Sequence, residues 1–275
     1  MKRLKKPLFL LLFSLFLLIF SGFDKRLQVT EYIYKSSEIP SSFDQFKICQ
    51  ISDLHCKSFG ENNRILLQKI KDLSPDIVVL TGDIVDEDHQ DLSSITDLFQ
   101  GLKDLGIPAY YITGNHELEP AALQQYEELQ SLMNAYGVTD LDDQTETITI
   151  GDDAIQLTGG KWYARYIVQY LKPADPEGFH ILLYHGADFF DLIDSYNYDL
   201  VLAGHIHGGL IRIPVLNIGL FGNLGDLFPK YSAGIYQNDT KDCTMIVSRG
   251  LGDARIPRFY NRPELVCITL ESGAP

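Results

Sequence analysis

Five short polar clusters in this chain each follow directly on an apolar run of the kind that forms a β-strand. Imidazole, carboxylate and amide groups recur in them, and these groups bind borderline and hard divalent metal ions. In an open α/β sheet, ligands bind beyond the carboxyl ends of the strands, so five strands can deliver all these groups to one place. The clusters are Asp53-Leu54-His55, Gly82-Asp83, Gly114-Asn115-His116-Glu117, His185, and Gly204-His205-Ile206-His207-Gly208-Gly209.

Taken singly, each cluster is a weak signal. A D-x-H triplet is common, and a lone histidine after a strand is more often a hydrogen-bonded structural residue than a ligand. However, five of the seven histidines fall within these clusters, and this ordered arrangement favours one shared site. None of the four cysteines belongs to a cluster or forms a CxxC pair, which argues against a structural zinc site and favours buried free thiols over disulfides. They are Cys49, Cys56, Cys243 and Cys267.

The elements that must position these clusters change in kind along the chain. In the first half, strand-like runs alternate with helical patterns, which indicates βαβ units. From Thr145 onward the pattern is strand-like with few helices, so we expect a second sheet. The predicted fold is an α/β, two-sheet β-sandwich flanked by helices, formed by a single domain over residues 27–275. The alternating strands are predicted at 45–52, 76–81 and 108–113, and the helices at 62–73, 92–105 and 121–136.

Residues 1–26 are predicted to form a separate N-terminal membrane anchor or signal segment. The basic sequence MKRLKK precedes an uncharged apolar stretch over residues 7–23, whose length is at the lower limit for a transmembrane helix. A retained anchor is favoured over a cleaved signal, since the only small-residue site is near Ser21-Gly22. More basic residues precede the stretch than follow it, which predicts a membrane-anchored protein with its domain on the extracytoplasmic side.

The charge balance narrows the class of substrate. The chain of 275 residues has a formal net charge of −14, and the basic N-terminal segment makes the remaining domain more acidic still. Such a surface repels a phosphate backbone, so no nucleic-acid partner is expected.

The order of the clusters resembles the signature of the calcineurin-like metallophosphoesterase superfamily, which reads D-x-H, G-D, G-N-H-E/D, H and G-H-x-H. The resemblance covers about residues 30–270. The later runs GHIHGGLIRIP, FPKYSAGIY, VSRGLG and NRPE are similar to its membrane-associated bacterial branch, described as YkuE- or YaeI-like. One departure is Gly186, which follows His185 where a side chain is expected and which bears on a nearby substrate contact.

The resemblance implies two divalent metal ions, Mn, Fe or Zn, and assigns their ligands. Asp83 bridges the two ions and is catalytic in that role. His116 stays off the metals and donates a proton or hydrogen bond to the leaving oxygen. One ion is held by Asp53, His55 and His207, and the other by Asn115, His185 and His205.

The function that follows is hydrolysis of a phosphodiester or pyrophosphate bond, with a lipid or cell-envelope precursor as the substrate that best suits the anchor. A phosphoprotein or phosphomonoester phosphatase is the alternative, and a non-catalytic scaffold of the same fold is less favoured because no ligand is missing. Arg212 and Arg249 are candidate contacts for a substrate phosphate, although surface or ion-pair arginines are the commoner outcome.

Overall fold

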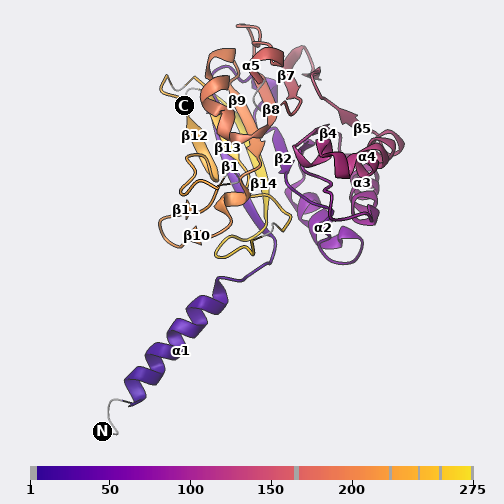
Figure 1. The fold of residues 1–275 in the computed structure, drawn as a ribbon. Coiled ribbons are helices and arrows are strands. Elements are labelled where there is room, and N and C mark those ends of the chain that lie inside the picture. The colour runs from indigo at the N-terminus through magenta and orange to yellow at the C-terminus, as the bar shows by residue number, and fades with distance from the viewer. Residues whose placement is uncertain (1–4, 164–166, 223–224, 241, 254–255, 274–275) are drawn as a thin grey trace.

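The computed structural model describes residues 5–163, 167–222, 225–240, 242–253 and 256–273. Two six-stranded sheets form the centre of the domain (Figure 1). The first sheet has the strand order β1-β14-β2-β3-β4-β5, in which all neighbours are parallel except β14 and β2. These strands are β1 (Gln28–Ser36), β2 (Lys47–Ile51), β3 (Ile77–Thr81), β4 (Ala109–Ile112), β5 (Val138–Asp140) and β14 (Glu264–Ser272).

The second sheet has the order β12-β13-β9-β8-β7-β6, with a parallel centre and an antiparallel pair at each edge. A separate two-stranded hairpin joins β10 (Arg212–Ile213) to β11 (Ile218–Gly219). The strands of the second sheet are β6 (Thr145–Ile150), β7 (Asp153–Gly160), β8 (His180–Gly186), β9 (Leu200–Gly204), β12 (Gly234–Gln237) and β13 (Thr244–Val247).

Successive residues of a central strand serve different layers of the core, because side chains alternate between the two faces of a sheet. Val79 of β3 and Leu183 of β8 belong to the core between the two sheets. Their neighbours Leu80 and Leu182 point to the opposite faces, where they join two further clusters. Both faces of each sheet are therefore covered, which explains why these strands read as continuous apolar runs.

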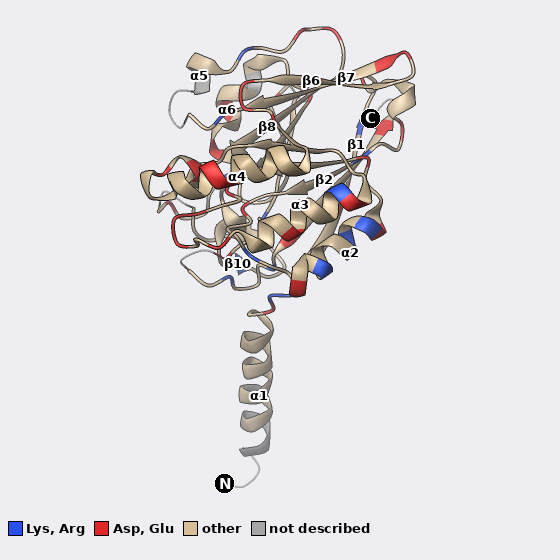
Figure 2. Ribbon diagram, turned by 90° about the vertical axis from the view of Figure 1, so that its right-hand side faces the viewer, with Lys and Arg blue, Asp and Glu red and all other residues tan. Residues whose placement is uncertain are grey.

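The outer face of the first sheet is covered by α2 (Arg64–Leu73), α3 (Ser93–Leu105) and α4 (Leu123–Tyr136), as Figure 2 shows. The short helices α5 (Ile167–Tyr170) and α6 (Phe190–Ile193) belong to the second half of the chain. The prediction of a two-sheet α/β fold is confirmed. Three strands, β1, β5 and β11, were not predicted. β1 is an edge strand that pairs in parallel with β14, the last strand of the chain.

The N-terminal segment forms helix α1 (Lys5–Ser21), which projects from the domain (Figure 1). Among the residues that the structure describes, no helix has both the length and the apolar character needed to cross a membrane.

Candidate metal centre

The polar clusters lie at the ends of strands that are neighbours within each sheet. Asp53 and His55 follow β2, Asp83 follows β3, and Asn115 follows β4, so these three parallel strands deliver their clusters to one edge of the first sheet. β8 and β9 are likewise parallel neighbours, and they place His185 and His205 at one edge of the second sheet. The candidate site therefore lies where the two sheets meet at their carboxyl ends.

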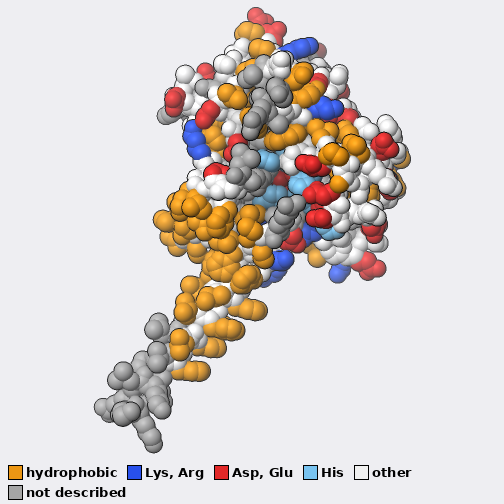
Figure 3. All heavy atoms as spheres, in the orientation of Figure 1, with side chains coloured by type: hydrophobic (Ala, Val, Ile, Leu, Met, Phe, Trp, Pro, Cys, Tyr) orange, Lys and Arg blue, Asp and Glu red, His pale blue; other side chains and the backbone are white. Residues whose placement is uncertain are grey.

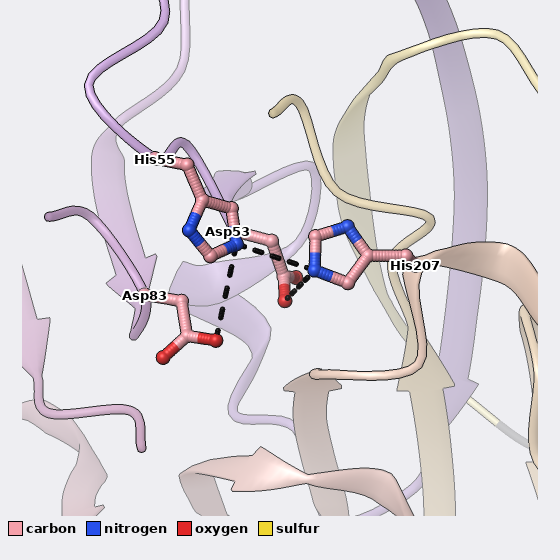
Figure 4. A group of neighbouring side chains, drawn as sticks. All are labelled: Asp53, His55, Asp83 and His207. Atoms are coloured by element: carbon pink, nitrogen blue, oxygen red, sulfur yellow. Dashed lines mark hydrogen bonds and ion pairs between the residues drawn. The ribbon is translucent and has the colours of Figure 1, made fainter. Parts of the chain in front are cut away.

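The first group of side chains with metal-ligand geometry contains Asp53, His55, Asp83 and His207, all of them buried. Figure 4 shows that they converge on one point from different segments. The His207 Nε2 lies 3.2 Å from the His55 Nε2 and 3.5 Å from the Asp53 Oδ1, and the His55 Nε2 lies 4.0 Å from the Asp83 Oδ2. These four side chains can hold one divalent ion.

The second group contains Asp83, His185 and His205, also buried. The His185 Nε2 lies 3.0 Å from the Asp83 Oδ2 and 3.2 Å from the His205 Nδ1. Asp83 belongs to both groups, so one carboxylate stands between two adjacent cation positions. The structure thus places six of the seven predicted ligands in two adjacent groups, and the assignment of these residues and of Asn115 as metal ligands stays a prediction.

The backbone around the site is held in an unusual conformation. Asp53, His55, Asp83, His205 and His207 all have positive φ, between 48° and 74°. Side-chain-bearing residues rarely adopt this region, and each instance costs roughly 1–3 kcal/mol, so such residues cluster at functional sites. The surrounding sheets therefore force five candidate ligands into a geometry that stability alone would not select.

Glycine at position 114 permits the loops after β3 and β4 to touch. A Cβ at Gly114 would overlap the Oδ1 of Asp83 and the adjoining backbone. The same Oδ1 accepts a hydrogen bond from the His116 N–H at 2.9 Å. This close approach fixes Asp83 relative to the His116 loop.

The side chain of Glu117 joins the loops that follow β3 and β4. Its buried carboxylate accepts hydrogen bonds from the backbone N–H groups of Asp83 at 3.0 Å, Ile84 at 2.6 Å and Gly114 at 2.8 Å. Burial, followed by the nearby charge of Asp83, raises the pKa of Glu117 to about 7. Glu117 is thus a positioning residue for the two loops and does not itself belong to either group.

His116 lies at the edge of the site. Its Nδ1 is 2.7 Å from Glu87, and its Nε2 is 4.0 Å from the Asp83 Oδ2. Its side chain is 27% exposed, unlike those of the buried groups. His116 belongs to neither candidate metal group. A partly exposed imidazole oriented by a carboxylate is suited to proton transfer with a bound substrate.

The charge of each histidine in the site depends on its burial and on its distance from the nearest carboxylate. Burial lowers the pKa of His205 to about 3 and also holds the pKa of His207 well below its usual value. Neutral imidazoles keep the lone pair that a metal needs. Burial opposes the charge of His185, but the adjacent Asp83 raises the pKa of His185 to about 10. A cation bound in the second group would replace His185 as the positive partner of the Asp83 carboxylate.

Asn115 supports the metal assignment independently. Its side-chain Oδ1 is buried and has no hydrogen-bond partner among the described residues. A buried amide oxygen without a partner is costly, and a cation would satisfy it. The carboxylate, imidazole and amide donors together fit divalent ions such as Mn, Fe or Zn.

The two candidate substrate arginines are engaged within the protein. The guanidinium of Arg212, which is 2% exposed, donates to the Gly208 carbonyl at 2.7 Å and to Asn217 Oδ1. Arg249 donates to Glu264 at 2.8 Å. Both line a cavity of about 120 Å³ beside β1. Contact of either arginine with a substrate phosphate stays a prediction.

Two residues contact the candidate metal ligands in a way that the sequence did not predict. Buried Arg258 places its Nη2 3.3 Å from the His207 Nδ1, and the loop containing Arg258 carries no sequence signal for this role. Trp162 packs its ring 4.9 Å from that of His205 and 5.6 Å from that of His185. Gly186 makes room for this tryptophan, since a Cβ there would lie 2.7 Å from its ring. In the sequence, the only indication of this contact was Gly186 itself, which stands where the family pattern has a residue with a side chain.

Comparisons with known proteins agree with this geometry. Residues 46–209 match the family model described as calcineurin-like phosphoesterase. The chain is 33% identical over 263 residues to the uncharacterized metallophosphoesterase YkuE of Bacillus subtilis, covering 90% of this chain and 86% of YkuE. It is 27% identical over 238 residues to the phosphodiesterase YaeI of Escherichia coli, covering 82% of each chain.

The chain belongs to the calcineurin-like phosphoesterase family. It is accordingly a metal-dependent hydrolase of phosphoric esters, with a candidate site for two metal ions.

Proposed function

We propose that this enzyme cleaves a phosphodiester or pyrophosphate bond in a lipid-linked or cell-envelope precursor, at a centre of two divalent ions. The observation that carries the reaction type is the membership of Asp83 in both metal-binding groups. Two bound ions supply positive charge for the phosphoryl oxygens and lower the pKa of the attacking water. The ligand set proposed is that of the two groups together with Asn115.

The residues of the chain have separate tasks in this proposal. Asp83 holds the two cation positions together, while Glu117 and Gly114 keep its loop in place. His116, oriented by Glu87, delivers a proton at Nε2 to the leaving oxygen. The partial exposure of His116 lets a substrate reach it without unfolding the site.

The diester preference and the location rest on weaker support. YaeI, a relative, is named a phosphodiesterase. The acidic domain disfavours nucleic acid, and the basic residues before the apolar stretch 7–23 favour an orientation with the domain outside the cytoplasm. Protease added to spheroplasts should therefore digest the domain, and protection until lysis would reverse this orientation.

The reaction is tested by a hydrolysis screen of the full-length chain with Mn²⁺. The substrates are a phosphomonoester, a small phosphodiester and a lipid-linked pyrophosphate, each with the His116→Ala variant in parallel. We expect turnover of the diester or pyrophosphate, and a rate about 10²–10⁴-fold lower for His116→Ala with metal content retained. Turnover of phosphomonoesters alone would select the phosphatase alternative, and no turnover of any substrate would favour a scaffold.

A further inference from the structure

Five exposed apolar side chains lie in the β10–β11 hairpin and the segment that follows it. We call this set the apolar rim, and Figure 3 shows hydrophobic side chains massed where α1 meets the domain. Val215 is fully exposed, and Leu216, Leu227 and Phe228 are each more than half exposed. A soluble domain rarely leaves such a cluster uncovered. The rim consists of Val215, Leu216, Ile218, Leu227 and Phe228.

Phe259 and Tyr260 connect the end of α1 to the hairpin that carries the rim. The Phe23 ring, just after the helix, packs 5.0 Å from the Phe259 ring, and the Tyr260 N–H donates to the Gly22 carbonyl at 2.6 Å. Phe259 in turn pairs with Ile211 at the start of the β10–β11 hairpin. The end of the helix and the hairpin that bears the rim are therefore neighbours on one surface.

The rim is equally tied to the loop that supplies the metal-binding histidines. The Gly209 carbonyl, two residues after His207, accepts hydrogen bonds from the N–H groups of Leu220 at 3.2 Å and Phe221 at 3.1 Å. Leu220 accepts a further bond from the Phe228 N–H at 3.0 Å. The backbone that carries the rim is therefore hydrogen-bonded to the segment directly after His207.

The distribution of apolar side chains around α1 indicates what covers this surface. Phe16, Leu17, Leu18, Ile19 and Phe20 are five consecutive exposed residues, so they cover every side of the helix. A protein groove buries one face of a helix, whereas hydrocarbon solvates all faces.

We propose that α1 and the apolar rim form one continuous surface that enters a lipid bilayer and holds the metal centre close to the headgroups. This inference rests on the membrane attachment in the proposed function and adds a second contact, made by the domain itself. A lipid whose phosphoester lies in the headgroup region would then reach the metals by lateral diffusion, without leaving the bilayer.

A tryptophan reporter tests the rim in the full-length chain. Trp162 is the sole tryptophan, so Trp162→Phe gives a silent background into which Phe228→Trp is introduced. Ile150→Trp is the matched control, because it lies at the end of β6, away from α1 (Figure 2). Both chains are reconstituted into phosphatidylcholine and phosphatidylglycerol vesicles whose acyl chains carry bromine, a short-range quencher.

We expect the tryptophan at 228 to shift to the blue and lose most of its fluorescence in these vesicles, while the tryptophan at 150 does neither. Co-flotation without quenching at 228 would show that only α1 touches the bilayer and would overturn the proposal. A blue shift that grows with protein concentration in the absence of vesicles would instead identify a second copy as the occupant. Because this readout needs no substrate, it can fail while lipid hydrolysis succeeds, or succeed while hydrolysis fails.

Discussion

The two candidate metal-binding groups share Asp83 but are held in place by different means. In the first, the His55 Nδ1 faces the buried carboxylate of Asp86 at 3.4 Å. In the second, the His185 Nδ1 lies 2.7 Å from the Thr81 carbonyl, and the Trp162 ring packs against both histidines. One position therefore depends on a charged side chain and the other on backbone and aromatic packing.

This difference teaches which substitutions can separate the two metals. A carboxylate that orients a histidine raises its basicity and fixes its ring, and removing such a partner typically costs about 10–100-fold in metal affinity. Packing against an aromatic ring fixes orientation without adding charge. The two positions should therefore respond to different variants, while both respond to a change at Asp83.

Asp83→Asn should have the largest effect because it acts on both groups. The amide retains the shape of the side chain but removes the shared negative charge, and the loss of several kcal/mol of metal-assisted stabilisation corresponds to roughly 10³-fold in rate. Turnover and metal content are measured together, with circular dichroism as the control for folding. Near-normal turnover would contradict the shared position of Asp83.

Asp86→Ala should weaken the first position alone. We expect its affinity for one equivalent of metal to fall by about 10–100-fold while the other equivalent is unchanged. Isothermal titration with Mn²⁺ resolves the two equivalents, and Asp88→Ala, an exposed neighbour, is the matched control. Equal weakening of both equivalents would mean that the groups are not held independently.

Trp162→Ala should weaken the second position, by about tenfold, the lower end of the range for supporting residues. Trp162→Phe keeps an aromatic ring against His205 and should restore most of the affinity. Gly186→Ala should reproduce the alanine effect, since its Cβ would displace the tryptophan. If the phenylalanine and alanine variants behave alike, the packing account of the second position is wrong.

Asp142→Asn should have the smallest effect, and on stability only. Asp142 accepts hydrogen bonds from the N–H and Oγ1 of Thr113, and burial raises its pKa to about 6. Because the folded-state pKa exceeds the unfolded value, its contribution to stability is complete below about pH 4 and is lost as pH rises through about 6. The variant should lack this decline.

The measurement is the free energy of unfolding in urea at several pH values between 4 and 7, for the parent and Asp142→Asn. The difference between the two chains should change across this window and be constant above it. A difference that is the same at every pH would show that Asp142 does not titrate in the folded protein.

The sequence predicted the site correctly where a polar cluster directly follows an apolar strand. Apolar runs such as the one before Asp53 predict both the strand and the direction of its carboxyl end, so the assembly of the site was predictable. Strand β1 was not predictable, because nothing in its own sequence indicates that it pairs with β14, the last strand of the chain. Arg258 and Trp162 were missed as supports for the same reason, since their contacts with His207 and His205 exist only in the folded chain.

The central claim is that one chain holds two interacting divalent ions, and electron paramagnetic resonance of the Mn²⁺-loaded full-length enzyme tests it most directly. The account predicts two equivalents of Mn²⁺ per chain with the spectrum of a spin-coupled pair, because Asp83 belongs to both groups. In Asp83→Asn the coupled signal should disappear. A single equivalent, or two equivalents with uncoupled spectra in the parent chain, would contradict the account.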